Sequence, residues 1–356
     1  MSLEHLRVDG VRCLAGVTVD LQASRNYIWG ANGAGKTSFL EAIYLLSRGR
    51  SFRTRQTGRL LRRGAASLSV FGIVRGADGQ KHRLGLEFAA GRLSSQIDGA
   101  TASSQAEMLW VLPVHVLDPR LHSLIEAGPS ERRRFIDAGV FHVEHSFLAD
   151  WRQYRRVLGQ RNAALKAGAA PSELALWTDP FLRFAKAVDH ARTEYCDKLA
   201  EKASKLGEML LGDQIELDYR NGWRRGISLD EALADSQERD RALGFTQVGP
   251  HRGDLRLEFA HGKIRDLASR GQQKLVAAAL VIAQVELFEE LTGMTSTVLV
   301  DDASAELDQS SQLRLSQALN ALRSQQILTG LSLDALRPEP GFPVFHVEQG
   351  KVHPVL

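Results

Sequence analysis

A glycine-rich segment, Gly30-Ala31-Asn32-Gly33-Ala34-Gly35-Lys36-Thr37, constrains this chain more than any other feature. It matches the pattern G-x-x-x-x-G-K-[ST], follows an apolar run over residues 26–29 and precedes apolar residues at helical spacing over residues 37–47. Glycine allows a turn tight enough for several backbone N–H groups to point at one anion, and a helix N-terminus adds partial positive charge. The segment, called the phosphate loop below, therefore predicts a strand, a phosphate-binding turn and a helix.

Three side chains at the end of the phosphate loop have predicted roles toward a nucleoside triphosphate. We expect Lys36 to reach the β- and γ-phosphates. Thr37 offers a hydroxyl to Mg²⁺, which prefers oxygen ligands and usually keeps several waters. Ser38 follows directly and completes the predicted binding segment. ATP and Mg²⁺ are the predicted ligands of residues 30–38.

An apolar strand pattern, Val298-Leu299-Val300, ends in two acids, Asp301 and Asp302. Folds with a phosphate loop use such a strand to carry an aspartate to the metal. We predict that Asp301 lies at Mg²⁺ and that Asp302 orients or deprotonates the attacking water. Together with Lys36 they are the predicted catalytic residues. The alternative is an ordinary turn after a strand, where aspartate is common.

A second glycine-containing segment, L-A-S-R-G-Q-Q-K over residues 267–274, opens a long apolar run with helical spacing. The Ser269 hydroxyl, Gly271 and the first N–H groups of the predicted helix, with Gln272, meet at one end that attracts anions. Taken alone, the segment is also compatible with a plain helix N-cap.

The order of patterns along the chain predicts an α/β protein of two lobes. Alternating residues at 17–21, 67–71 and 83–88 predict strands, several of them antiparallel, and residues 129–211 have helical spacing. Strand patterns return after Gln214. We therefore predict a head of mixed sheets and helices built from residues 1–125 and 214–356, with an all-helical lobe inserted at 126–213. This lobe is too short and too interrupted by Gly and Pro to form long coiled-coil arms.

The charge balance limits how the chain can meet nucleic acid. Its formal net charge is only +3, so any contact must come from local basic patches. Either of two arginine clusters could track a DNA backbone; the alternative is a solvated face paired with acids. No helix-turn-helix, zinc finger or aromatic array is evident, so duplex backbone binding is favoured over base recognition. The clusters are Arg53, Arg55, Arg59, Arg62 and Arg63, and Arg132, Arg133 and Arg134 with Arg152, Arg155, Arg156 and Arg161.

Cysteine usage and hydropathy favour an intracellular protein. Cys13 and Cys196 lie far apart, without neighbouring Cys or His that would suggest a zinc site. We expect both to be buried thiols in a reducing cytoplasm. The chain shows no signal-peptide pattern and no apolar run of about 18 residues, so we expect a cytoplasmic protein without a membrane partner.

Three segments in order resemble the motif set of ABC ATPases. They are the phosphate loop, S-x-G-Q-Q from Ser269, and D-D-x-x-A-E-L-D from Asp301 to Asp308. In that family the serine segment closes on ATP held by a second subunit, which implies such a contact for Ser269, Gly271 and Gln272. Asp302 stands where glutamate is common, which implies slow hydrolysis because the carboxylate is shifted. Thr329-Gly330 follows the strand pattern 326–329 where a histidine often stands, so no residue is assigned as γ-phosphate sensor.

Five stretches, two of which overlap these segments, resemble the RecF family of bacterial DNA replication and repair proteins over nearly the whole chain. Gly253 and Ser38 depart from that family, which usually has an acid and often an asparagine there, but neither touches the inferred chemistry. The stretches are residues 32–53, 128–137, 160–166, 248–255 and 269–273.

This resemblance implies an ABC-type ATPase head and an ATP-driven homodimer that clamps duplex or gapped DNA. Slow, DNA-dependent hydrolysis would release the DNA, in recombinational gap repair and replication restart, where the protein aids loading of recombinase with RecO and RecR. A metabolic phosphate-loop kinase would leave S-R-G-Q-Q and residues 301–308 unexplained. The nucleotide-binding subunit of a transporter fits poorly with the inserted lobe.

Overall fold

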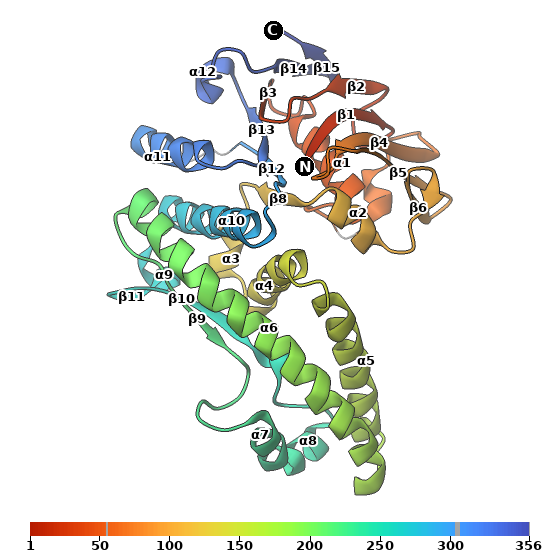
Figure 1. Cartoon of the computed structure of the whole chain (residues 1–356), viewed down its shortest axis with the longest axis vertical. Coiled ribbons are helices and arrows are strands. Elements are labelled where there is room, and N and C mark those ends of the chain that lie inside the picture. The colour runs from red at the N-terminus through yellow and green to blue at the C-terminus, as the bar shows by residue number, and fades with distance from the viewer. Residues whose placement is uncertain (55, 303–306, 356) are drawn as a thin grey trace. The chain divides into compact units, whose positions relative to one another are not determined.

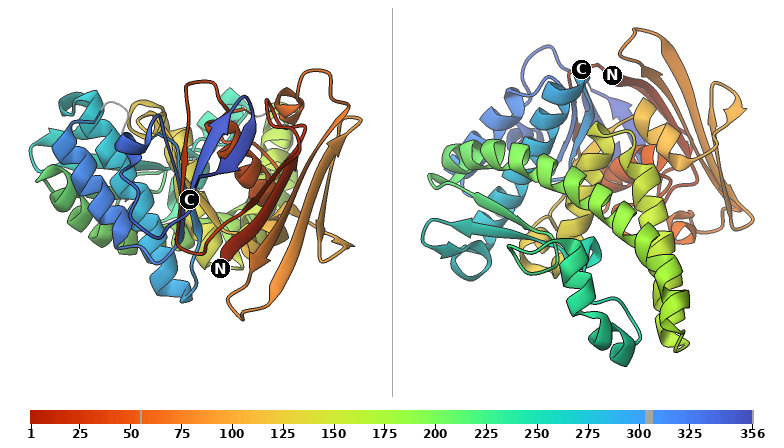
Figure 2. Two further views of the ribbon diagram at one scale, coloured as in Figure 1. Left: turned by 90° about the horizontal axis from the view of Figure 1, so that it is seen from above. Right: turned by 60° about the horizontal axis from the view of Figure 1, so that its bottom comes forward.

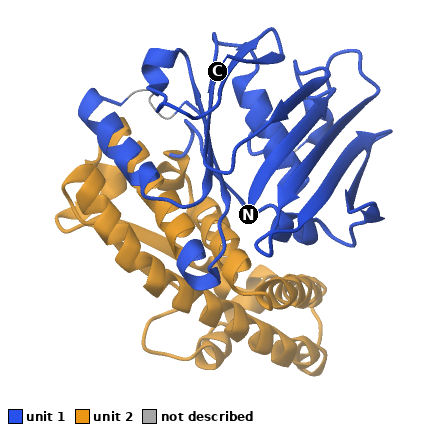
Figure 3. Cartoon of the chain, turned by 45° about the horizontal axis from the view of Figure 1, so that its top comes forward, with its two compact units in different colours: residues 1–121, 288–356 blue, residues 122–287 orange. Residues whose placement is uncertain are grey.

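The computed structural model describes residues 1–54, 56–302 and 307–355 (Figure 1). The chain forms two compact units, Met1–Leu121 with Phe288–Leu356, and His122–Leu287 (Figure 3). Arg55 of the first arginine cluster and residues 303–306 of the D-D-x-x-A-E-L-D pattern lie outside the described residues.

The first unit contains a six-stranded sheet in the order β15-β14-β3-β13-β12-β8. All neighbours in it are parallel except β14 and β15, which form an antiparallel hairpin. Because parallel strands share one direction, the residues that follow β3, β13 and β12 leave the sheet at the same edge. That edge carries both the phosphate loop and the two acids. The strands are β3 (Arg25–Trp29), β8 (Val114–Leu117), β12 (Thr297–Val300), β13 (Gln325–Gly330), β14 (Val344–Glu348) and β15 (Lys351–Pro354).

A second sheet of this unit is antiparallel, in the order β2-β1-β4-β5-β6-β7. The red and orange strands of this sheet lie side by side in Figure 2. The strands predicted at 17–21, 67–71 and 83–88 are confirmed as members of it. Buried and exposed residues alternate along β4 and much of β5, as expected for a sheet with one covered face. The strands are β1 (Ser2–Asp9), β2 (Val17–Asp20), β4 (Ser67–Arg75), β5 (Lys81–Ala89), β6 (Arg92–Ile97) and β7 (Ala100–Thr101).

Helix α1 (Lys36–Arg48) follows the phosphate loop and contacts strands of both sheets. The apolar face predicted for it, Phe39, Leu40, Ile43 and Leu46, is fully buried. The helix ends at Gly49, whose φ of 63° is the left-handed conformation that glycine adopts readily. The remaining helical elements of this unit are the 3₁₀ turn Thr57–Leu60, α2 (Gln105–Val111), α11 (Gln309–Asn320) and α12 (Leu333–Leu336).

The second unit consists mainly of helices around a small antiparallel sheet, β11-β10-β9. Between residues 126 and 213 the described elements are helices, but the unit continues to Leu287 because β9 packs on α6 and pairs with β10. The predicted boundary after residue 213 therefore does not separate the compact units. The elements are α3 (Ser123–Glu126), α4 (Pro129–Val143), α5 (Phe147–Lys166), α6 (Pro171–Leu211), β9 (Glu216–Arg220), α7 (Leu229–Asp235), α8 (Gln237–Leu243), the 3₁₀ turn Pro250–Arg252, β10 (Asp254–Phe259), β11 (Gly262–Lys263), α9 (Ile264–Leu267) and α10 (Arg270–Thr292), whose residues from Phe288 onward belong to the first unit.

The two cysteines differ in environment. Cys196 is buried in α6, where burial raises the pKa of its thiol, but Cys13 is exposed. The prediction that both are buried is wrong for Cys13 because it lies in the turn between β1 and β2, beside the phosphate loop and outside the apolar core. In residues 1–54, 56–302 and 307–355, no helix combines the length and apolar character needed to cross a bilayer.

Candidate functional site

The phosphate loop has the backbone that its glycines predict. Gly33 and Gly35 have φ values of 78° and 123°, which L side chains rarely adopt. A Cβ added to Gly33 would meet no atom within 4 Å, so the loop faces open space there. Helix α1 begins at Lys36 without a side-chain cap. The N–H groups of its first turn therefore remain available to an anion.

The β14–β15 hairpin supports the loop from behind. Gly350, in the turn of the hairpin, donates its N–H to the carbonyl oxygen of Ala34 at 2.8 Å. A Cβ on Gly350 would lie 2.1 Å from the Cys13 oxygen, and one on Gly30 would lie 2.2 Å from the Val347 oxygen. Sequence reasoning missed this support, because a glycine between two short strands indicates a turn but not what the turn packs against.

Lys36 is held at the loop by backbone carbonyls. Its Nζ donates to the oxygens of Gly30 at 2.7 Å and Ala31 at 3.1 Å, and only 7% of the residue is exposed. Burial lowers the pKa of Lys36, and the nearby carboxylates of Asp302 and Asp301 partly oppose that shift. A buried ammonium with so little solvent is stabilised by an anion, as expected of a phosphate-binding lysine.

The structure brings Thr37 and Asp301 together across the sheet edge. Thr37 Oγ1 lies 2.9 Å from Asp301 Oδ2 and 3.1 Å from Oδ1, and Thr329 Oγ1 lies 3.0 Å from Oδ1. Burial raises the pKa of Asp301, while hydrogen bonds from the two hydroxyls lower it. The hydroxyl and carboxylate oxygens form a compact set of hard donors.

The neighbouring acid, Asp302, has a φ of 50°, which is uncommon for a residue other than glycine. Its N–H donates to Thr329 Oγ1 at 3.0 Å. Thr329, near the position where the resemblance to ABC ATPases implies a γ-phosphate sensor, thus contacts both acids. Its hydrogen bonds could not be read from the sequence.

A side chain of helix α1 also holds the backbone at the beginning of the first arginine cluster through hydrogen bonds. Glu41, fully buried, accepts from both Nε and Nη2 of Arg12 at 3.1 Å and from the Ser51 hydroxyl. Ser51 Oγ in turn accepts from the N–H groups of Arg53 at 2.8 Å and Thr54 at 3.1 Å. Sequence reasoning missed this network. The described arginines of the cluster, Arg53, Arg59, Arg62 and Arg63, are exposed.

In the second unit, the serine segment caps α10. Ser269 Oγ accepts from Gln272 N at 3.3 Å, and Gln272 Oε1 accepts from Ser269 N at 2.9 Å, a reciprocal capping arrangement. Both side chains are exposed, and Gly271 lies in the first turn of the helix. The helix-cap interpretation therefore describes this conformation, and contact with nucleotide stays a prediction.

Comparisons with known proteins agree with this geometry. The chain matches the family described as RecF/RecN/SMC N terminal domain over residues 2–339. The DNA replication and repair protein RecF of Pseudomonas putida (strain W619) is 38% identical over 359 residues, which cover 99% of this chain and 98% of that protein. The chain belongs to the RecF family.

Solved structures bear out the architecture expected of the RecF family. The recombination mediator protein RecF-ATP in the RecFOR pathway superposes with a TM-score of 0.87 at 26% identity, over 100% of this chain and 98% of the other. An Smc head bound to the C-winged helix domain of ScpA shares the fold, with a TM-score of 0.64 at 18% identity over 100% and 97% of the two chains. The predicted α/β head of an ABC-type ATPase is confirmed.

Several stretches that resemble the RecF family converge inside the second unit. Arg192 pairs with Asp137 through two bonds of 2.8 and 3.0 Å and donates to the Pro250 oxygen at 2.7 Å. His251 Nδ1 lies 2.7 Å from the Tyr154 hydroxyl, and burial lowers the pKa of His251 to about 4, so the ring is neutral at pH 7. Residues 128–137 and 248–255 therefore maintain the unit's internal structure.

The second arginine cluster separates into buried and exposed members. Only 1% of Arg161 is exposed, and it donates to Asp240 Oδ2 at 2.8 Å. The interpretation that it tracks DNA is therefore wrong. Arg132 forms a two-bond pair with Asp254 at 2.7 and 3.0 Å, and Arg133 donates to the Gly253 oxygen at 2.7 Å. The exposed members are Arg134, Arg152, Arg155 and Arg156.

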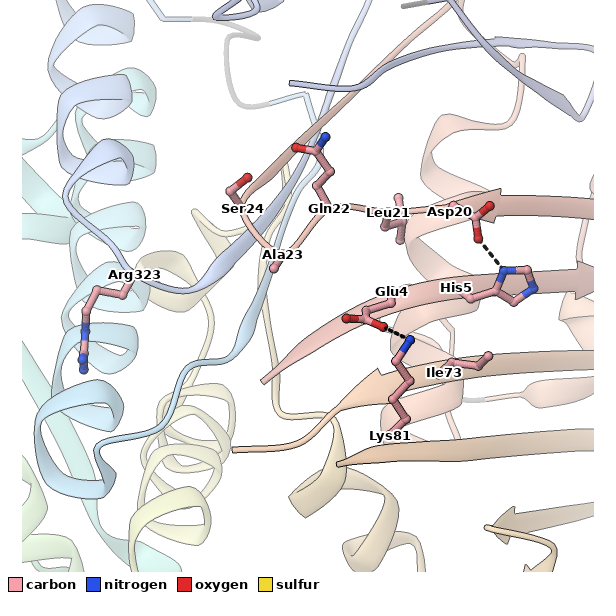
Figure 4. A pocket seen from close by; sticks show the side chains of 10 residues that line it. All are labelled: Glu4, His5, Asp20, Leu21, Gln22, Ala23, Ser24, Ile73, Lys81 and Arg323. Carbon is pink, nitrogen blue, oxygen red and sulfur yellow. Dashed lines mark hydrogen bonds and ion pairs between the residues drawn. The ribbon is translucent and has the colours of Figure 1, made fainter. Parts of the chain in front are cut away.

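A cavity of about 760 Å³ in the first unit includes no residue of the phosphate loop (Figure 4). Its charged side chains are paired: Glu4 with Lys81 at 2.9 Å, His5 with Asp20 at 2.7 Å, and Arg323 with Glu289, which does not line the cavity, at 3.4 Å. With these charges already paired, the cavity does not present an anion or cation site like that of the phosphate loop.

Proposed function

We propose that this chain is an ATP-dependent DNA-binding ATPase of recombinational gap repair and replication restart. The observation that carries the proposal is the edge of the parallel sheet, where the phosphate loop with Lys36, the Thr37 hydroxyl and the Asp301 carboxylate meet within hydrogen-bond distance. Membership of the RecF family and the likeness to RecF-ATP support ATP as the ligand.

Residues 30–38 would hold the triphosphate, and Thr37 and Asp301 would hold Mg²⁺. Mg²⁺ binds through one or two protein oxygens, waters and phosphate oxygens, which fits this set. Among the described residues, no three His, Cys, Asp or Glu side chains gather into a metal site, so the proposed metal depends on phosphate as a ligand. When bound, Mg²⁺ offsets negative charge on the phosphates.

The protein's own groups supply the remaining chemistry. Lys36 exchanges its carbonyl partners for phosphate oxygens, and Asp302 orients the attacking water and accepts its proton. The aspartate side chain is one methylene shorter than glutamate, which favours slow hydrolysis. A slow ATPase suits a switch, because the ATP-bound state lasts long enough to act on DNA.

We place the switch in a homodimer in which Ser269, Gly271 and Gln272 face nucleotide held by the partner copy. The exposed start of α10 supports this assignment, since a helix N-terminus attracts anions. ATP favours the closed dimer only as far as it binds that state more tightly than the open one. Contacts from Ser269 to the γ-phosphate would supply this difference, and hydrolysis removes it.

The exposed arginines of the two clusters would contact the phosphate backbone of duplex or gapped DNA. The RecF-ATP relative is described as part of the RecFOR pathway. We therefore propose that this chain works with RecO and RecR in recombinase loading, and that DNA stimulates its weak ATPase.

Sedimentation of the full chain with duplex DNA and Mg-ATP tests the proposed function. The wild type is expected to form a DNA-bound dimer only with ATP. Lys36→Ala should prevent nucleotide binding, Ser269→Arg should leave an ATP-bound monomer, and Asp302→Asn should prolong the DNA-bound dimer because hydrolysis slows.

Arg92→Gln, a change at an exposed arginine of β6 outside both clusters, is the control and should sediment as the wild type does. If the wild type stays monomeric and ignores DNA with every nucleotide, the clamp is refuted. Transfer of phosphate to a small acceptor without DNA binding would instead indicate a kinase.

Salt dependence of DNA binding tests the arginines of α5. Log K falls as log salt rises, and each lost phosphate contact reduces the magnitude of this negative slope by about 0.9. We expect Arg156→Gln to lower it by about that amount and Arg152→Gln/Arg155→Gln/Arg156→Gln by up to about 3. Fluorescence anisotropy of a labelled duplex with ATP measures the slopes. An unchanged slope in the triple variant would exclude α5 from the DNA contact.

A further inference from the structure

We propose that Thr329, the penultimate residue of β13, is a positioning residue that sets the orientation of both acids. The inference rests on the proposed function and extends it to a residue outside the predicted site. Strand β13 pairs with β3 on one side and β12 on the other. Its end therefore lies between the strand that leads to the phosphate loop and the strand that leads to the acids.

The Thr329 hydroxyl bonds to the two acids in different ways. It accepts from the Asp302 N–H at 3.0 Å and donates to Asp301 Oδ1 at 3.0 Å; the Val300 oxygen is farther, at 3.3 Å. One hydroxyl has a single proton and can accept at its lone pairs. One atom thus fixes a carboxylate oxygen of Asp301 and the backbone of Asp302.

Asp301 is held at both carboxylate oxygens by hydroxyls from different elements. Thr37 on α1 lies closer to Oδ2, at 2.9 Å, and Thr329 on β13 holds Oδ1. Without Thr329, the carboxylate would keep only the Thr37 hydroxyl and could rotate about its last bond. The metal-facing direction of Asp301 therefore depends on a residue that the metal does not touch.

Asp302 depends on Thr329 through its backbone. Its φ of 50° costs conformational energy for a residue other than glycine, and such backbones persist where neighbours hold them. Only 2% of Thr329 is exposed, so water does not readily replace its hydroxyl. Loss of the hydrogen bond to the Asp302 N–H would change the backbone conformation and therefore the direction in which the Asp302 side chain points.

Position 330, the last residue of β13, has no room for a side chain. A Cβ on Gly330 would lie 2.6 Å from Leu336 Cγ, and the Gly330 oxygen accepts from Gly30 N at 3.3 Å. A side chain there would push against α12 beside the start of the phosphate loop. The hydroxyl that contacts the acids is therefore on the preceding residue, Thr329.

The test compares Thr329→Val and Thr329→Ala with Thr329→Ser in the full chain. Binding of a fluorescent ATP analogue is titrated in EDTA and against Mg²⁺, and kcat and KM are measured separately. We expect unchanged binding in EDTA, a Mg²⁺ requirement raised by about 10–100-fold, and kcat lowered by about the same factor at similar KM. Serine restores both, because it retains the hydroxyl.

Thr297→Val is the matched control, since Thr297 is a buried threonine at the other end of β12 that bonds Gln325. It should leave Mg²⁺ dependence and kcat unchanged. The inference is overturned if Thr329→Val and Thr329→Ala match that control, or if serine fails to rescue. If Thr329→Val prevents folding, the comparison of Thr329→Ala with Thr329→Ser tests the inference. A wild type that neither binds nor hydrolyses ATP refutes the proposed function itself.

Discussion

Gly350→Ala is expected to weaken nucleotide binding by more than about tenfold, although Gly350 lies far from the phosphate loop in sequence. The added Cβ would lie 2.1 Å from the Cys13 oxygen, and the N–H of Gly350 holds the Ala34 oxygen at 2.8 Å. Both neighbours are backbone atoms, so no side chain can rotate away. The hairpin must move, and the loop loses its support from behind. We expect nucleotide affinity to fall by more than about tenfold, or about 1.4 kcal/mol.

Gly341→Ala is the control that separates the collision of the added Cβ with neighbouring atoms from the strain of a left-handed backbone. Gly341 also has a positive φ, 89°, but a Cβ there would meet nothing within 4 Å. Both variants bear about 1–2 kcal/mol of left-handed strain; only Gly350→Ala adds the collision. Thermal unfolding and titration of a fluorescent ATP analogue measure the two effects. Equal nucleotide affinity in the two variants would show that the hairpin does not support the site.

Arg161→Met is expected to destabilise the second unit by about 3–5 kcal/mol without weakening DNA contacts directly. The change leaves the Asp240 carboxylate, which is fully buried, without its cationic partner at 2.8 Å. The Gln247 N–H at 2.8 Å still bonds the other oxygen but does not neutralise the charge. Hydrogen exchange of the backbone amides of α5 and α8 under native conditions measures the local loss of stability in the two helices that carry this pair.

Arg156→Met on the same helix is the matched comparison and should show the opposite pattern. Its side chain is exposed, so stability should change by less than about 0.5 kcal/mol while DNA affinity falls. Adding Asp240→Asn to Arg161→Met should restore part of the lost protection, because it removes the uncompensated charge. Arg161→Met with normal exchange rates would contradict the buried pair.

Local patterns predicted the elements and part of the site. Apolar spacing located α1, β12 and α10, and the parallel arrangement brought Thr37 and Asp301 together at one edge. These predictions succeed because a phosphate loop requires specific residues at fixed spacing. The assignment of Thr37 and Asp301 as Mg²⁺ ligands stays a proposal.

Other features could not be read from local patterns because they depend on contacts between distant segments. Nothing near Arg161 in sequence distinguishes it from Arg156, since Asp240 arrives from α8. Cys13 looks like an apolar residue at a strand end, but the chain turns there and leaves the thiol exposed. Thr329 acquires its partners only when β13 lies between β3 and β12.

The brace between residue 350 and residues 13 and 34 also sets an order of events during synthesis. The phosphate loop leaves the ribosome early, but its supporting hairpin, near the end of the first unit, follows only after the whole second unit has been translated. At roughly 5–20 residues per second, that delay is on the order of tens of seconds. Throughout this interval the nascent chain carries the loop sequence without the hydrogen bond from Gly350. The phosphate loop therefore gains this support only at the end of synthesis, when residue 350 becomes available to Ala34.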